Sequence, residues 1–439
     1  MKVLKFGGTS VGTAQRIKNV AALVSERRPS IVVLSAMSGT TNTLVEICDY
    51  LHKDNSSAAL EITRNLEDRY NQVINELFTD NNESRNNCKN KVGNIFKSLR
   101  NNISEQFTEK EEKEILAKGE LISTTLMRMY MESIGIEAGY LPALDFMRID
   151  RDTEPDSHYI EANLKRILNS MAEFPIYITE GYICRNSDGD IDNLRRGGSD
   201  LTASLIGAAI KAEEIEIWTD IDGMHNNDPR FVENTRPVKK LHFEEAAELA
   251  YFGAKILHPT CVLPAKVHNI PVRLLNTMEP SATGTLIHNF EPSGTIKAIA
   301  AKDNITAIKI KSGRMLLAYG FLRKVFEIFE TYRTPIDMIT TSEVGVSVTV
   351  DNEHELPYIV DELKKFGTVT VDKDMVIICV VGDMDWQNKG FEAKALDALK
   401  DVPVRMISYG GSNYNISILV RKEDKVNALK ALSNKLFNG

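Results

Sequence analysis

Apolar residues in the first 55 positions alternate between short strand-like runs and helical spacing. Residues 3–6 form a short apolar run, and the apolar positions from Ile17 to Val24 recur at intervals of three and four. Residues 31–34 are rich in β-branched side chains and precede a second helical stretch. This order of strand, helix, strand and helix predicts a parallel sheet with helices packed on its faces.

The pattern changes twice further along the chain. From about Ser56 to Ser133 it is polar and helical, which we interpret as a helical excursion from the sheet. Strand-like runs then resume, and the α/β pattern continues to about Leu286. The sequence NFEPSGT at residues 289–295 places Pro and Gly between two periodic regions, which is typical of a linker.

Beyond this linker the sequence contains a repeat. Met338 and Ile339 recur as Met406 and Ile407, and the same shift of 68 residues carries residues 346–350 onto residues 414–418. Residues 344–350 alternate strictly between apolar and small or polar side chains, which predicts a strand. Two homologous units, each of the order strand, helix, strand, strand and helix, are therefore predicted.

The repeat also suggests how the units are divided. Residues 367–371 supply a last strand to the first unit only, and we infer that residues 296–301 supply the missing strand of the second unit. The first unit would then be an insertion within the second. The expected domains are residues 1–290, residues 303–371, and residues 296–302 together with residues 372–439.

The overall charge argues against a nucleic-acid partner. The chain has 53 basic and 61 acidic residues, a formal net charge of −8, and no long basic run. A binding site for an anionic ligand in such a protein must gather its positive charge locally, from a few Lys and Arg side chains and from backbone amides.

The cysteines and the apolar runs indicate the compartment. The five cysteines are far apart and include no CxxC pair, which predicts free thiols in a reducing compartment. No stretch approaches the roughly 18 to 20 apolar residues of a membrane span. We therefore expect a cytoplasmic protein with no membrane partner.

Lys5, Gly7 and Gly8 form the first candidate functional site. They place a lysine at a strand end and two glycines in the following turn, where bare amides can approach an anion closely. Phosphoryl transfer needs positioning and neutralised charge, and such a turn supplies both. The Walker and Rossmann glycine patterns are absent from the sequence. The alternative is a plain tight turn.

A second pair of glycines, Gly197 and Gly198, follows Arg195 and Arg196 and precedes Ser199 and Asp200. Arginine is suited to bind a carboxylate with two hydrogen bonds. Asp200 alone could be only a helix N-cap. Two such turns, each with a cation and each opening a helix, can face one another across a sheet edge and hold two anionic reactants.

Three further segments carry polar candidates. Thr219 and Asp220 end a predicted strand, where open α/β sheets bind ligands, and Arg230 follows an Asp-Pro turn. Lys255 could equally be a solvated lysine, and Glu120 could be only an acid in the first turn of a helix. No metal cluster stands out in the sequence, and we expect Mg²⁺ to be held chiefly by ATP phosphates.

Six motifs in order, KFGGTSVG, GELIS, RRGGSD, WTDIDG, NDPR and FGAKILHP, resemble the aspartate kinase family. The repeated C-terminal half resembles the paired ACT domains of those enzymes. The resemblance implies an α/β fold, with an amino-acid-kinase-like, parallel-rich sheet sandwiched by helices and then two ferredoxin-like βαββαβ ACT domains. It implies transfer of phosphate from ATP to L-aspartate, giving 4-phospho-L-aspartate for lysine, threonine and methionine synthesis.

The resemblance also implies residue roles. Lys5 would neutralise the transferring phosphoryl group, Asp200 would organise the centre, and Arg196 would bind the α-carboxylate of aspartate, with Glu120 near its ammonium. The ATP side would comprise Lys5, Gly7, Gly8, Thr219, Asp220, His225, Arg230 and Lys255, and the aspartate side Thr41, Glu120, Arg196 and Ser199. His225 stands where relatives carry a tyrosine.

The segments from Ser312 to Leu322 and from Asp337 to Glu343 resemble the lysine-sensitive branch of the family. By analogy the effector pocket would use Met315, Ala318, Gly320, Phe321, Leu322, Asp337, Ser342 and Glu343. The acids Asp337 and Glu343 suit the ammonium groups of lysine, although they could simply lie at a sheet edge. ACT domains usually pair edge to edge, so the resemblance implies a homodimer.

Two other functions are compatible with parts of the sequence. One is a related kinase for glutamate or another acidic amino acid, against which the GELIS segment and the paired ACT units argue. The other is a catalytically inactive amino-acid sensor, which the presence of Lys5, Arg196, Asp220 and Lys255 argues against.

Overall fold

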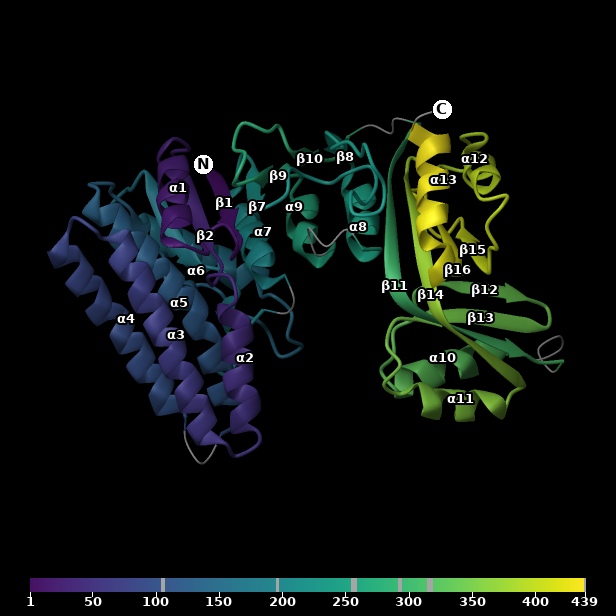
Figure 1. Cartoon of the computed structure of the whole chain (residues 1–439), viewed down its shortest axis with the longest axis horizontal. Coiled ribbons are helices and arrows are strands. Elements are labelled where there is room, and N and C mark those ends of the chain that lie inside the picture. The colour runs from purple at the N-terminus through teal and green to yellow at the C-terminus, as the bar shows by residue number, and fades with distance from the viewer. Residues whose placement is uncertain (104–106, 195–196, 254–258, 291–293, 314–318, 438–439) are drawn as a thin grey trace. The chain divides into compact units, whose positions relative to one another are not determined.

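The computed structural model (Figure 1) describes residues 1–103, 107–194, 197–253, 259–290, 294–313 and 319–437. The chain forms two compact units. The first comprises Met1–Met224 and Ile256–Asn289, and the second comprises His225–Lys255 and Phe290–Gly439. Each unit is described separately below. Within the described residues, no helix has both the length and the apolar content needed to cross a membrane.

The first unit is built on a mostly parallel sheet. Its strands lie in the order β3-β4-β2-β1-β7-β9-β10, and β9 and β10 alone among these neighbours run antiparallel. The bounds are β1 (Lys2–Phe6), β2 (Ser30–Leu34), β3 (Gly139–Tyr140), β4 (Ile176–Glu180), β7 (Ile215–Thr219), β9 (Val272–Asn276) and β10 (Thr285–Ile287). The central strand β1 is hydrogen-bonded on both sides, so its carboxyl end lies in the middle of the sheet edge.

Helices follow the strands as the hydrophobic periodicity predicts. They are α1 (Ala14–Ser25), α2 (Thr40–Leu51), α3 (Ser56–Leu77), α4 (Asn82–Asn102), α5 (Glu109–Ser133), η1 (Ala143–Asp145), α6 (Ser157–Ser170), α7 (Gly198–Ile210), η2 (Pro259–Val262) and α9 (Leu263–Val267); a small hairpin joins β5 (Ile183–Arg185) to β6 (Ile191–Asn193). The predicted helical excursion consists of α3, α4 and α5, which lie side by side (Figure 1). Their apolar faces join those of α1 and α2 in one core.

The second unit contains an antiparallel sheet in the order β12-β13-β11-β14-β16-β15. Its elements are β8 (Lys240–Leu241), α8 (Phe243–Tyr251), β11 (Ile296–Lys311), α10 (Phe321–Thr331), β12 (Ile339–Ser342), β13 (Gly345–Val350), α11 (Leu356–Lys364), β14 (Thr368–Gly382), α12 (Phe391–Ala398), β15 (Met406–Tyr409), β16 (Asn415–Arg421), η4 (Lys422–Asp424) and α13 (Lys425–Phe437). The predicted fold class, a kinase-like parallel sheet followed by ferredoxin-like ACT units, is confirmed.

Two long strands, β11 and β14, are each shared by both ACT units. Residues 296–302 of β11 pair with the second half of β14, whereas residues 305–311 pair with the first half of β14 and with β13. Separate hydrophobic clusters lie over the two halves of the sheet. Each ACT unit therefore contains one half of each long strand.

The register of the repeat differs from the sequence match. Ile339 lies opposite Val348, while Ile407 lies opposite Ile418. Ile339 and Ile407 are 68 residues apart, whereas their partners Val348 and Ile418 are 70 residues apart. The expected correspondence of residues 346–350 with residues 414–418 is therefore wrong. Ten residues separate Ile407 from Ile418, two more than separate Ile339 from Val348, and a slip of two residues keeps every side chain on the same face.

Residues 225–255 belong to the compact second unit. The amide of Asn415 donates a hydrogen bond to Glu248, and the rings of His242 and Tyr414 stack with centroids 5.1 Å apart. The two units are divided by how compactly their residues pack, whereas the expected domains were divided by sequence pattern and repeat. The domain limits expected from the sequence, including the boundary at residue 290, therefore stay predictions.

Candidate active site

A cavity of about 420 Å³ opens in the first unit at the carboxyl ends of β1 and β2. Parallel strands bring their carboxyl ends to one edge of a sheet, where ligands of open α/β folds bind. The lining comes from five separate segments of the chain. It comprises Lys5, Gly8, Thr9, residues 35–39, Thr41, Asn42, Glu120, Tyr182 and residues 197–200. The structure thus brings together Lys5, Gly8, Thr41, Glu120, Ser199 and Asp200, and their roles stay predictions.

An ion pair joins the two glycine-rich turns. The ammonium Nζ of Lys5 lies 2.6 Å from Oδ1 of Asp200, and both side chains are about nine-tenths buried, with exposed fractions of 11% and 12%. Gly197, with φ of +77°, is the N-cap of α7, so the reading of Asp200 as N-cap is wrong. Asp200 instead lies in the first turn of α7, where the helix dipole favours a carboxylate.

Gly8 allows two loops to touch. A Cβ atom on Gly8 would lie only 2.6 Å from the carbonyl oxygen of Ala36, and the Gly8 carbonyl accepts a hydrogen bond of 3.0 Å from the Ser38 amide. Gly7 is tied to the neighbouring strand by its amide, which donates to the Trp218 carbonyl at 3.1 Å. The first glycine turn is therefore fixed between β2 and β7, and α1 begins only at Ala14.

Glu120 is a buried acid. Its side chain accepts a hydrogen bond of 3.1 Å from the Ala36 amide, and burial raises the pKa of its carboxyl to about 8. The reading of Glu120 as an acid in a first helical turn is wrong, because α5 begins at Glu109 and Glu120 lies near its middle. A Cβ on Gly119 would lie 2.7 Å from the Ala36 Cβ, so a glycine there permits the close approach that buries Glu120.

Sequence reasoning missed two residues beside Glu120. Glu180, at the end of β4, accepts hydrogen bonds from Thr124, Tyr140 and the Ala143 amide at 2.8 to 3.0 Å, and burial raises its pKa. Tyr182 lines the cavity, and burial raises its pKa to about 12. An acid at the end of an apolar strand followed by glycine, as in Thr-Glu-Gly-Tyr, is the signal that could have found them.

The residues expected on the ATP side are divided between the two units. Thr219 and Asp220 end β7 at the same sheet edge, and the Thr219 carbonyl accepts a hydrogen bond of 2.8 Å from the Thr277 amide, but neither residue lines the cavity. His225 and Arg230 belong to the second unit, where Nδ1 of His225 lies 2.9 Å from the Thr235 hydroxyl.

Some predicted residues cannot be placed. Arg196 and Lys255 lie outside the described residues. No group of three or more His, Cys, Asp or Glu side chains in the described ranges could hold a metal ion.

Comparison with known proteins agrees with this geometry. Residues 1–276 match the amino acid kinase family, and residues 378–436 match the ACT domain. Over 99% of its length, the chain is 34% identical to aspartokinase 1 from Arabidopsis thaliana chloroplasts, of which the match covers 80%. It is also 32% identical to lysine-sensitive aspartokinase 3 of Escherichia coli, covering 99% of both chains. The chain belongs to the aspartokinase family.

Solved aspartokinase structures share the architecture of the whole chain. The E. coli aspartokinase III complex with aspartate and ADP, called its R-state, has a TM-score of 0.84 and 31% identity, with complete coverage of both chains. The E. coli complex with lysine and aspartate, called its T-state, has a TM-score of 0.80 and 30% identity, covering 100% of this chain and 99% of that one.

The effector residues expected by analogy with lysine-sensitive aspartokinases have different surroundings. Asp337 precedes β12 with only 2% of its side chain exposed, whereas Ser342 and Glu343 are exposed where β12 turns into β13. Gly320, with φ of +78°, is the N-cap of α10, Phe321 is buried in its first turn and Leu322 is 37% exposed. Met315 and Ala318 lie outside the described residues.

Proposed function

We propose that this aspartokinase transfers the γ-phosphoryl group of ATP to the side-chain carboxylate of L-aspartate, giving 4-phospho-L-aspartate and ADP. The observation that carries the proposal is the ion pair of Lys5 and Asp200 within one cavity that also holds the Gly8 turn and Glu120. Aspartate and ADP are bound by the E. coli relative of the same architecture, which supports both substrates.

The reaction needs charge neutralisation more than proton transfer. An oxygen of the aspartate side chain attacks the γ-phosphorus, the bond from that phosphorus to the bridging oxygen breaks, and ADP leaves. The attacking carboxylate is already ionised near neutral pH, so no general base is required. Lys5 neutralises the transferring oxygens, Asp200 positions its ammonium, and the turn at Gly8, which lines the cavity, cradles the phosphates. Mg²⁺ enters with ATP, held by the phosphate oxygens.

Glu120 suits the α-ammonium of aspartate. Its carboxyl lines the cavity, and its raised pKa means that much of it is protonated near neutral pH before substrate binds. An approaching ammonium favours the ionised carboxylate, so binding of aspartate releases a proton. Arg196 would bind the α-carboxylate, with Thr41 and Ser199 lining the same cavity. Thr219, Asp220, His225, Arg230 and Lys255 remain the residues proposed for the nucleotide.

Regulation by L-lysine at the first ACT unit is part of the same proposal. The E. coli relative is named lysine-sensitive, and its T-state complex contains lysine. In this chain, the buried carboxylate of Asp337 provides an acceptor for an ammonium group. We also propose a homodimer formed through ACT units, for which the exposed Ile339 on the terminal strand β12 offers an apolar contact.

A direct assay tests the catalytic proposal. The purified protein is incubated with ATP, Mg²⁺ and either L-aspartate or L-glutamate, and the acyl phosphate is trapped with hydroxylamine while ADP is measured. We expect hydroxamate with aspartate only. Lys5→Met should lower its rate of formation by about 10³-fold, whereas the control Lys53→Met, at an exposed position after α2, should not change it. Equal rates with glutamate, or no hydroxamate from either amino acid, would overturn the proposal.

A further inference from the structure

Two buried acids lie at the active cavity and beside it, and the reaction proposed above uses only one of them. Glu120 lies near the middle of α5 with 4% of its surface exposed, and Glu180 ends β4 with 1% exposed. The hydroxyl of Thr124, one turn after Glu120, donates a hydrogen bond of 2.9 Å to Oε1 of Glu180 and lies 2.9 Å from the backbone carbonyl of Glu120. One hydroxyl therefore links the strand of Glu180 to the helix of Glu120.

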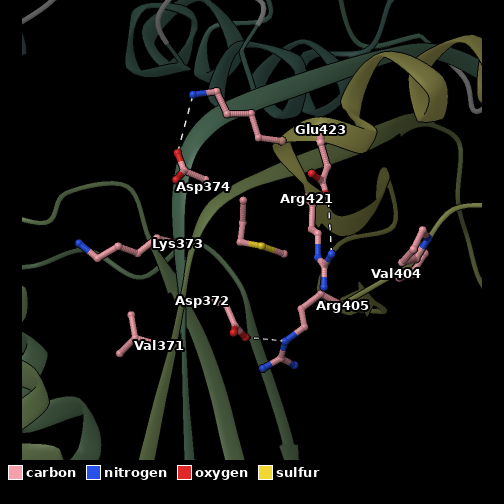
Figure 2. A pocket seen from close by; sticks show the side chains of 11 residues that line it. Val371, Asp372, Lys373, Asp374, Val404, Arg405, Arg421 and Glu423 are labelled. Carbon is pink, nitrogen blue, oxygen red and sulfur yellow. Dashed lines mark hydrogen bonds and ion pairs between the residues drawn. The ribbon is translucent and has the colours of Figure 1, made fainter.

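The acids of another cavity have basic partners. Figure 2 shows an open cavity of about 820 Å³ in the second unit, where each acid of the lining pairs with a base: Asp372 with Arg405, Asp374 with Lys422 and Glu423 with Arg421. In contrast, neither Glu120 nor Glu180 forms an ion pair with a Lys, Arg or His side chain that the structure describes. Two neighbouring buried carboxylates without a base are costly to ionise together, so the pair retains one proton.

Hydrogen-bond donors decide which of the two acids keeps this proton. Within the described residues, Glu180 accepts three hydrogen bonds, from the hydroxyls of Thr124 and Tyr140 on Oε1 and from a backbone amide on Oε2. Glu120 accepts one, from a backbone amide at 3.1 Å. Donors stabilise the ionised form of a carboxyl, so the negative charge of the pair belongs on Glu180 and the proton on Glu120.

The charges around Glu120 agree with this division. Burial raises the pKa of Glu120 to about 8, the charge of Glu180 adds to that increase, and the charge of Lys5 opposes it. Lys5 is itself paired with Asp200, which weakens its effect on Glu120. Removing the charge of Glu180 should therefore lower the pKa of Glu120.

The groups on the other side of Glu180 are phenols and one cation. The guanidinium of Arg128 lies 3.9 Å from the ring centroid of Tyr140, and the charge of Asp145 acts on the same phenol. Burial raises the pKa values of the phenols around the acid pair, which are Tyr70, Tyr140 and Tyr182. These phenols stay neutral near neutral pH, so they take no part in the ionisation of the pair.

We propose that Glu180 is a positioning residue of the aspartate site, which keeps the charge of the buried pair and so holds the proton on Glu120 until the α-ammonium of aspartate binds. The ammonium then favours the ionised form of Glu120, and the proton passes to water in the open cavity. No bond of the substrate changes in this step. The inference rests on the proposed binding of aspartate at Glu120, and it gives a role to an acid that does not itself line the cavity.

The pH dependence of the KM for aspartate tests this role on the full chain. Glu180→Gln keeps the shape of the side chain but removes its charge, so Glu120 should ionise at lower pH. We expect the midpoint of the KM profile to move down by about one pH unit, and the KM at about pH 6.5 to be about fivefold lower than in wild type. Glu173→Gln removes an equal charge from an exposed position before β4 and should leave the profile unchanged.

The outcomes separate this inference from the proposed function. A residue with only a structural role would raise the KM at every pH when it is replaced, and it would not improve binding at low pH. A midpoint equal to that of wild type would overturn the inference alone. If wild type does not phosphorylate aspartate, the proposed function fails as well.

A second measurement does not depend on the folding of Glu180→Gln. Near neutral pH, the infrared spectrum of wild type should lose one protonated-carboxyl band when saturating L-aspartate binds, whereas the spectrum of Glu120→Gln should lose none. Loss of that band in Glu120→Gln would assign the proton to another acid and overturn the inference. No loss in wild type would overturn it too.

Discussion

The candidate active cavity and the charge cluster of the first ACT unit both centre on a lysine, but they balance its charge differently. Lys5 faces one carboxylate, that of Asp200, whereas Lys302 faces two, those of Asp337 and Asp351. A balanced pair leaves the ammonium able to attract a phosphoryl group, while surplus negative charge attracts a further cation. The two lysines therefore differ in the net charge of the groups around them.

The largest expected effect in this comparison comes from Lys5. Lys5→Met should lower kcat by about 10³-fold, because the charge on the transferring oxygens is no longer neutralised. Measuring ADP release with aspartate gives the rate, and calorimetry should show that L-lysine binding is retained. A kcat within about tenfold of wild type would contradict the role of Lys5.

Asp200 should have the next largest effect. Asp200→Asn keeps the shape of the side chain but removes the charge that positions the Lys5 ammonium, so kcat should fall by about 10- to 100-fold. Asp188→Asn, at an exposed turn between β5 and β6, is the matched control. If both variants retain the wild-type rate, the ion pair serves the fold only.

Glu120 should make aspartate binding depend on pH. Since its folded-state pKa is about 8, the KM for aspartate should fall as pH rises from 6.5 towards about 8.5, where the carboxylate becomes ionised. Glu120→Gln should raise KM by about tenfold at the higher pH and flatten the profile. A profile that keeps its slope in the glutamine variant would assign the titration to another group.

The raised pKa of Glu120 also predicts that stability changes with pH. A carboxyl whose pKa is raised on folding holds its proton more tightly in the folded state, so the free energy of unfolding should decrease as pH rises from the unfolded value of 4.5 to about 8. Glu120→Gln should lose this part of the slope in urea unfolding measured across that range.

The smallest expected effect is at Arg405, which precedes β15 in the second ACT unit as Asp337 precedes β12 in the first. Arg405→Gln changes a partly exposed pair in the second ACT unit and creates no buried acid, so the affinity for L-lysine should stay within about twofold of wild type. A large loss of affinity would mean that the two ACT units do not differ as their charges indicate.

Local sequence patterns predicted much of the fold. The alternating strand and helix periods, the helical excursion and the repeated C-terminal units follow from side-chain spacing, which the backbone geometry of helices and strands imposes. The predicted register of the repeat was wrong by two residues, because a slip of two preserves the alternation of faces and leaves no trace in the pattern.

By itself, the sequence indicated that the two glycine turns beside Lys5 and Asp200 can face one cleft, whereas Glu120 was assigned to it only by the resemblance to aspartate kinases. Only the tertiary structure decided which acids are buried and which cations they face. Glu180, Tyr182, Lys302 and Tyr251 acquire their surroundings from segments distant in the chain. Desolvation and charge pairing depend on those surroundings, and no local pattern encodes them.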